Sequence, residues 1–213
     1  MRPRLDLSVY VVLDLDTTAA AAIVPLAQAA AAGGATLLQL RDKRGPARRT
    51  VELARALLAA VDLPLIVNDR VDVALAAGAA GAHVGQDDLP AAAARAILGP
   101  DRILGLSVTG AHEIETVDPA LVDHVGLGPV FATATKPDAA APLGVEGFAA
   151  IRRRLALPVV AIGGLGPDNA ARAIAAGADG IAVVSAVAGA ADPAAATARL
   201  VALVAQARRA SAA

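Results

Sequence analysis

Eight short apolar runs recur along the chain, and within each run the hydrophobic positions are mostly consecutive rather than alternating. Consecutive apolar positions are typical of parallel strands that are buried on both faces. We therefore expect a sheet of parallel strands. The runs predict strands over residues 9–15, 36–40, 64–68, 81–85, 102–106, 123–128, 158–164 and 180–185.

Alanine-rich stretches with helical spacing separate these strands, for example residues 19–34, 47–61, 70–78 and 167–177. Several end in glycine, a common helix stop, and several begin at proline or aspartate, common helix starts. Eight strand–helix units predict an α/β fold, a (β/α)8 TIM barrel formed by a single compact domain over residues 1–213. An open doubly wound sheet is the alternative, but no GxGxxG motif follows the first strand.

The composition excludes several classes of function. Aromatic residues make up 1% of the sequence and the net charge is −1, so we expect no nucleic-acid partner. The absence of cysteine excludes disulfides and thiolate chemistry and is compatible with a reducing cytoplasm, where we place the protein. The longest uncharged segment, residues 17–40, is interrupted by Pro25 and the Gly33–Gly34 pair, so we expect no membrane span.

Polar residues or glycines follow nearly every predicted strand. In a barrel these positions meet at the carboxyl ends of the strands, where active sites lie. This convergence is the strongest sign of function in the sequence. The residues are Gln39, Arg41, Asp42, Lys43, Asn68, Asp69, Gln86, Asp87, Asp88, Ser107, Thr133, Thr135, Lys136, Gly163, Gly164, Val184 and Ser185.

Asp69 and Asp88 follow two neighbouring strands. Either one could cap the next helix, because aspartate is a favoured N-cap residue. Alternatively, the two carboxylates approach one ion. Oxygen ligands favour Mg²⁺, which typically takes one or two carboxylates and completes its shell with phosphates and water. The residues alone leave both roles open.

Glycines and hydroxyls near the last three strands suit an anion. The Gly163–Gly164 turn leads into a helix, where backbone N–H groups can meet a phosphate, and Val184–Ser185 offers a second such turn. Barrels often hold phosphate after strands seven and eight. Thr133, Thr135 and Lys136 add two hydroxyls and a cation, a set that suits a diphosphate.

The three histidines show no metal-ligand spacing. We expect His83, at the end of the fourth strand, to line the barrel mouth. His112 and His124 are expected at ordinary surface or helix positions. None of the three is assigned a catalytic role.

Taken together, these motifs resemble those of the thiamine phosphate synthase family, in order and spacing from the second strand to the eighth. Members of this family are transferases with a (β/α)8 barrel. The resemblance implies an enzyme that joins hydroxymethylpyrimidine diphosphate to thiazole phosphate, giving thiamine monophosphate and pyrophosphate. The matching segments are "LQLRDK", "LIVNDRVDVALAAGAAGAHVGQDDLP", "ILGLSV", "VGLGPVFATATKPDAAAPLG", "VVAIGGLGPDNA" and "GIAVVSA".

The resemblance also implies a role for each motif residue. Asp69 and Asp88 would hold Mg²⁺, and Ser107 and Lys136 would act in catalysis at the diphosphate. The side-chain chemistry of Thr133 and Thr135 alone suits the diphosphate, but the resemblance implies that they bind the thiazole phosphate. The pyrimidine diphosphate would be bound by Gln39, Arg41, Lys43, Asn68, Ser107 and Lys136, with Arg41 in support. The thiazole phosphate would be bound by Thr133, Thr135, Gly164, Val184 and Ser185.

Two other functions compete with this one. A thiazole tautomerase would share the barrel and the thiazole phosphate site, but would need neither the Asp69–Asp88 pair nor Lys136. A paralogue that only binds ligand and regulates would have no reason to keep a metal pair. The partners expected are small phosphorylated molecules, and the sequence leaves open whether the chain forms a homo-oligomer.

Overall fold

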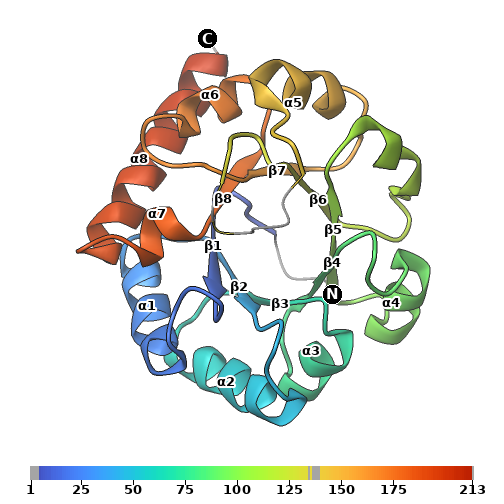
Figure 1. The fold of residues 1–213 in the computed structure, drawn as a ribbon, viewed down its shortest axis with the longest axis vertical. Coiled ribbons are helices and arrows are strands. Elements are labelled where there is room, and N and C mark those ends of the chain that lie inside the picture. The colour runs from blue at the N-terminus through green and yellow to red at the C-terminus, as the bar shows by residue number, and fades with distance from the viewer. Residues whose placement is uncertain (1–4, 134, 136–139, 213) are drawn as a thin grey trace.

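Strands and helices alternate along the chain in the computed structural model, which describes residues 5–133, 135 and 140–212 (Figure 1). A strand forms at each of the eight apolar runs, so all eight predicted strands are confirmed. They are β1 (Val9–Asp14), β2 (Leu37–Arg41), β3 (Leu65–Asn68), β4 (Gly81–Val84), β5 (Ile103–Val108), β6 (His124–Leu127), β7 (Val159–Ile162) and β8 (Gly180–Val183).

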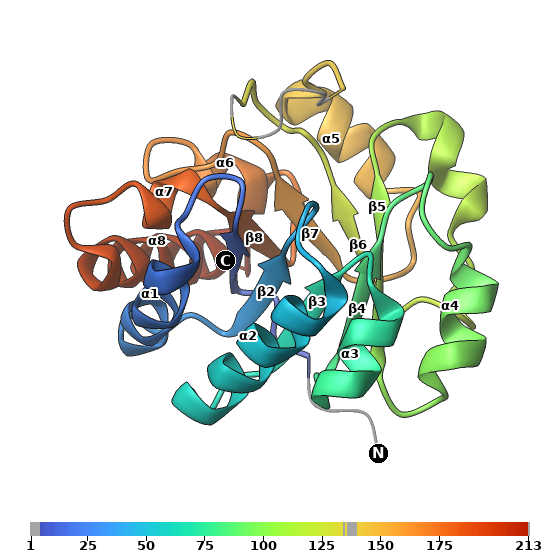
Figure 2. The ribbon, with the colours of Figure 1, turned by 60° about the horizontal axis from the view of Figure 1, so that its bottom comes forward.

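The eight strands form a closed parallel barrel in sequence order. The barrel closes where β1 pairs with β8, with Val9 opposite Ile181. Helices surround the ring of strands, as Figures 1 and 2 show. The predicted (β/α)8 barrel is therefore confirmed, and the open doubly wound sheet is wrong.

The helices follow the strands with one exception. After β5 the chain forms a 3-10 helix, η1 (Ala111–Thr116), where the repeat predicted an α-helix. The β-branched residues Ile114, Thr116 and Val117 have low helix propensity, and Pro119 follows them, so a longer helix is disfavoured. The α-helices are α1 (Ala20–Ala32), α2 (Ala47–Ala60), α3 (Val71–Ala77), α4 (Ala91–Leu98), α5 (Gly144–Arg152), α6 (Ala170–Ala175), α7 (Ser185–Ala188) and α8 (Pro193–Ala212).

Alternate positions of each strand pack into two different layers, which explains why the apolar runs are continuous. Tyr10 and Val12 belong to a buried cluster built from several strands, inside the barrel. Val9, Val11 and Leu13 belong to another cluster, which includes helix residues and lies between the barrel and its helices. No helix among the described residues has both the length and the apolar character needed to cross a membrane.

Candidate active site

Gln39 lies in the middle of β2 and Arg41 at its carboxyl end, and each is held by a residue of β1 or the loop after it. The Gln39 side-chain amide donates to the Tyr10 hydroxyl at 2.7 Å, and both side chains are buried. The Arg41 guanidinium contacts both carboxylate oxygens of Asp14 at 2.9 Å and one of Asp16 at 2.9 Å. Burial alone would lower the pKa of Arg41, but the two carboxylates raise it above its ordinary value, so this group stays cationic.

The carboxyl groups of Asp69 and Asp88 meet, as their places after β3 and β4 predicted. Burial and the Asp88 carboxyl raise the pKa of Asp69, and the Lys43 ammonium, which contacts the Asp69 carboxylate, opposes that rise. Asp69 has φ 60°, the one positive value among described non-glycine residues. Its backbone N–H donates to the His83 carbonyl at 2.7 Å, which helps to hold this unfavourable conformation.

Neither aspartate caps the helix that follows it. Arg70 is the N-cap residue of α3 and Pro90 that of α4, and neither helix has a side-chain cap hydrogen bond. The Asp88 carboxylate instead accepts the backbone N–H of Gly85 at 2.8 Å. The capping alternative is thus wrong, and both carboxylates remain at the barrel mouth beside Asn68, the last residue of β3.

Ser107, on β5, contacts His83 of β4 and Gln86 of the loop after β4. Its hydroxyl lies 2.9 Å from Nε2 of His83, and its carbonyl accepts the side-chain amide of Gln86 at 2.7 Å. His83 is thus in the barrel next to a predicted site residue, and His112 is exposed on η1.

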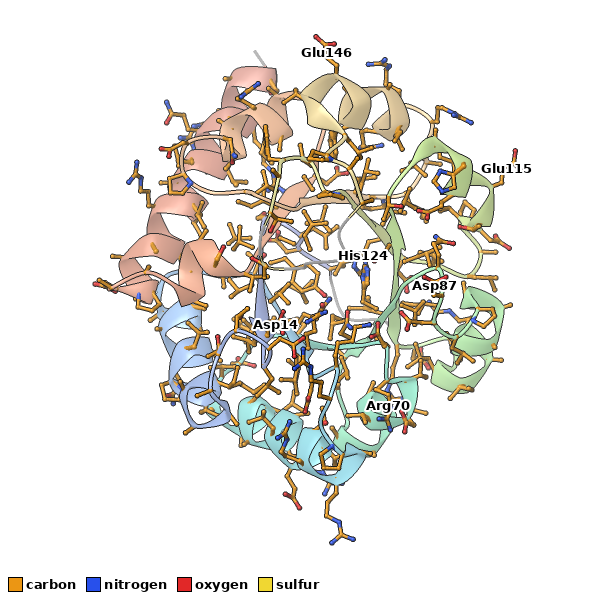
Figure 3. All side chains as sticks on the ribbon, in the orientation of Figure 1. Asp14, Arg70, Asp87, Glu115, His124 and Glu146 are labelled. Atoms are coloured by element: carbon orange, nitrogen blue, oxygen red, sulfur yellow. The ribbon has the colours of Figure 1, made fainter. Side chains whose placement is uncertain are left out.

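The expectation for His124 is wrong. This residue begins β6 and is fully buried within the ring of strands, as Figure 3 shows. The run "DHVGLG" predicted a strand, but it could not show that His124 turns toward the barrel interior.

A cavity of about 560 Å³ lies where the loop after β6 meets the turns after β7 and β8. This volume suits a small ligand. Four of the five residues predicted to bind thiazole phosphate line the cavity; the fifth, Val184, directly precedes Ser185. The lining residues are Ala132, Thr133, Thr135, Gly164, Leu165, Gly166, Asp168, Asn169, Ser185 and Ala186.

Glycine is required at position 164 in this cavity. Gly164 has φ +64°, and a Cβ there would lie 2.4 Å from the Ala132 carbonyl oxygen. The Asn169 side chain braces the same turn, accepting the Gly166 N–H at 2.9 Å and donating to the Gly164 carbonyl at 2.9 Å. These two hydrogen bonds hold the turn, and its close approach to the β6 loop shapes the cavity wall.

The sequence did not single out Tyr10, Asp14, Asp16 and Asn169 as residues that support the site, and it named Gln86 as a candidate without giving it a role. Asp14 and Asp16 could have been found from the sequence, because they stand at or just after the end of a buried strand, where the other predicted site residues stand. Tyr10 left none, since a tyrosine inside an apolar run is expected to pack. Lys136, predicted to act at the diphosphate, lies outside the described residues.

Comparison with known proteins decides the family. Residues 9–187 match the family described as thiamine monophosphate synthase. This chain belongs to that family. A thiamine-phosphate synthase of Azorhizobium caulinodans is 52% identical over 190 residues, which cover 88% of this chain and 90% of the relative. A thiamine-phosphate synthase of Moorella thermoacetica is 49% identical over 97% of this chain and 99% of its own length.

A solved structure agrees with these sequence comparisons. A thiamine phosphate pyrophosphorylase from Pyrococcus furiosus superposes with a TM-score of 0.86 at 38% identity, covering 95% of this chain and 97% of its own. The predicted family and the predicted class of enzyme are thereby confirmed. The binding role of each site residue stays a prediction.

Proposed function

We propose that the chain condenses hydroxymethylpyrimidine diphosphate with thiazole phosphate, releasing pyrophosphate and forming thiamine monophosphate. One observation carries the proposal: the same end of the barrel holds both a carboxylate pair and a separate cavity lined by hydroxyls and glycine. Two phosphorylated substrates that must meet need two such places at one mouth. Family membership and relatives named thiamine-phosphate synthase support the same reaction.

The donor set at Asp69 and Asp88 fits Mg²⁺. The pKa of Asp69 is raised by burial and by the second carboxyl, so a divalent cation would relieve the unfavourable contact between two like charges. The described residues contain no group of three or more histidine, aspartate or glutamate side chains that could hold a metal. Water and the diphosphate would therefore supply the remaining ligands, as Mg²⁺ commonly accepts. Bound there, the ion would stabilise charge on the leaving group.

The proposed reaction breaks one bond and forms another without an oxidant or reductant. The bond between the methylene carbon and the diphosphate oxygen breaks, and the electron pair leaves with pyrophosphate. The aminopyrimidine ring donates electrons to the methylene carbon, and the thiazole nitrogen then forms the new carbon–nitrogen bond. Because no proton must be removed from a substrate in these steps, the protein needs to place charges rather than supply a general base.

Cations at the mouth suit the diphosphate. Lys43 already contacts the Asp69 carboxylate, so a metal at that carboxylate would leave the ammonium free to meet a diphosphate oxygen. Arg41 stays fixed by Asp14 and supports the same region. Gln39, Asn68, Ser107 and Lys136 complete the proposed set. On the other side, Thr133, Thr135, Gly164, Val184 and Ser185 would receive the thiazole phosphate.

The absence of cysteine and of a basic block supports a cytoplasmic enzyme that works without a nucleic-acid partner. Its substrates would be small phosphorylated molecules. A homo-oligomer remains compatible with this function.

Pyrophosphate release from purified protein tests the proposal. We expect release only when both substrates and Mg²⁺ are present, and none when the metal is chelated. Isomerisation of a thiazole phosphate without pyrophosphate release would favour the tautomerase instead. Binding of thiazole phosphate without any turnover would favour a regulatory paralogue.

A further inference from the structure

Two buried histidines face each other inside the barrel, directly under Ser107. His83 lies on β4 and His124 on β6, and both are paired in register with Gly105 of the strand between them. Their ring centroids are 5.4 Å apart, and Nδ1 of His83 lies 3.4 Å from Nε2 of His124. Nε2 of His83 continues the line to the Ser107 hydroxyl at 2.9 Å.

Glycines make room for this imidazole pair. A Cβ at position 105 would lie 2.2 Å from Nδ1 of His83 and 2.5 Å from Cε1 of His124, far inside van der Waals contact. A Cβ at Gly126 would lie 3.0 Å from Cε1 of His83. Across three adjacent strands, the missing side chain of Gly105 therefore leaves the space that the imidazoles of His83 and His124 fill.

Burial disfavours a charge on either imidazole, and the two facing ring nitrogens, 3.4 Å apart, need one N–H donor and one acceptor. Burial lowers the pKa of His83 to about 4, against an opposing effect of Asp88. Burial, together with the neighbouring His83, lowers the pKa of His124 well below its ordinary value. A neutral imidazole carries one N–H donor and one acceptor nitrogen, so the proton positions in the chain of contacts are linked.

One unpaired atom indicates which residue donates in each contact of the row His124–His83–Ser107. Among the described residues, Nδ1 of His124 is the buried side-chain nitrogen or oxygen without a hydrogen-bond partner. If Ser107 donated inward, His83 would donate to His124, and His124 would be left with a buried, unpaired N–H. If instead His124 donates to His83 and His83 donates to Ser107, Nδ1 of His124 carries no proton and only its lone pair is unpaired. A buried lone pair without a partner is less costly than a buried N–H without one.

We propose that His83 and His124 are positioning residues that make Ser107 a hydrogen-bond donor to an anionic oxygen of the substrate diphosphate. His124 donates through Nε2 to Nδ1 of His83, and His83 donates through Nε2 to the Ser107 oxygen. The Ser107 oxygen then accepts a hydrogen bond from His83, so its own O–H donates to another acceptor. Gln86 fixes the backbone of Ser107 at the same time. The identity of the acceptor rests on the proposed function, whereas the direction of the protons does not.

Long-range proton–nitrogen NMR spectra test the direction without any substrate. We expect both buried histidines to carry their proton on Nε2, with the exposed His112 as the reference signal. A spectrum with His124 protonated on Nδ1 would overturn the proposal.

A double-mutant cycle tests the connection to Ser107. With thiazole phosphate saturating, His83→Leu should lower kcat/KM for the pyrimidine diphosphate about tenfold, because a hydrogen bond to a charged group loses its orientation. The same change in a Ser107→Ala background should cost almost nothing further. His83→Gln, which keeps an N–H donor, should restore most of the loss, and His112→Leu should change nothing. A tenfold loss that persists without the Ser107 hydroxyl would contradict the proposal.

A wild-type protein that released no pyrophosphate would contradict the proposed function instead. The same cycle would then be measured as calorimetric affinity for inorganic pyrophosphate with Mg²⁺. Equal losses in both backgrounds would again count against the histidines acting through Ser107.

Discussion

The two ends of the barrel arrange their aspartates differently. At the amino ends, Asp123 and Asp179 each accept both a backbone N–H from a neighbouring strand and an arginine side chain. At the carboxyl ends, Asp69 and Asp88 bring two like charges together. Each of these two aspartates at the amino ends is paired with an arginine, whereas at the carboxyl ends Lys43 offsets only part of the repulsion between Asp69 and Asp88, which a bound cation would relieve further.

The arrangement at the amino ends is repeated two strands apart. Arg95 of α4 reaches Asp123, which precedes β6, and Arg152 of α5 reaches Asp179, which precedes β8. The Asp123 carboxylate accepts the N–H of Leu104 at 2.8 Å, and the Asp179 carboxylate that of Val159 at 2.8 Å. We infer that these pairs hold adjacent strands in register, while the carboxyl ends are left to chemistry.

The largest effect is expected at the carboxyl ends. Asp69→Asn or Asp88→Asn should lower turnover by at least about a hundredfold, because metal stabilisation of the leaving group is lost. The unfolding free energy should not fall, since each change removes one of two like charges. Steady-state assays and urea unfolding of the same preparations measure both quantities. Unchanged turnover in either variant would remove the metal assignment.

A change at the amino ends should do the reverse. Arg95→Ala should lower the unfolding free energy by about 3 kcal/mol, because it leaves the largely buried Asp123 carboxylate without its cation. The same arginine also donates to the carbonyls of Leu121, Gly99 and Arg102, which would lose a partner. Turnover at low temperature, where the variant is still folded, should match wild type. A selective loss of kcat in folded protein would break the division between the two ends.

The histidines between the two ends predict a pH dependence of stability. The folded-state pKa of His83 is about 4 against an ordinary 6.5, so between these values the unfolded chain binds more protons than the folded one. The contribution of His83 should therefore lower stability by about 2 kcal/mol from pH 7 to pH 5, and His124 should add a loss of the same sign. Urea unfolding at both values measures the loss. The His83→Leu variant is the control, and its unfolding free energy should fall by about 2 kcal/mol less than that of the wild type over the same pH range. An equal loss in both proteins would contradict the lowered pKa of His83.

The smallest effect is expected at the second arginine pair. Arg152→Ala repeats the Arg95→Ala change in the same local arrangement, but the Asp179 side chain is 43% exposed and that of Asp123 only 12%. Solvent can replace the lost cation, so we expect a loss of about 1 kcal/mol in unfolding free energy. Losses of equal size at the two positions would show that burial does not set the strength of these pairs.

The eight strands could be predicted because parallel strands buried on both faces need unbroken apolar runs. Asp69 and Asp88 could be brought together for a similar reason, since residues that end neighbouring parallel strands share one edge. Position along the chain was enough for both predictions.

The layer in which a side chain packs could not be predicted in the same way. Whether His124 faces the barrel interior depends on register, and its contact with His83 depends on Gly105 in a third strand. The contact of Tyr10 with Gln39 and that of Arg41 with Asp14 likewise join separate strands. Such contacts leave no periodic signal in one sequence.

The closing seam between β1 and β8 has a consequence for the newly made chain. Arg208 of α8 donates to the Ser8 hydroxyl at 2.6 Å, a contact between residues 200 positions apart. Until β8 emerges from the ribosome, β1 has one open side with unpaired backbone groups, and an open strand is a template for aggregation. Sealing that side also requires the closure of a very long loop. The interval before β8 is made should therefore be the time when this protein most depends on chaperones, although its finished barrel has no edge at all.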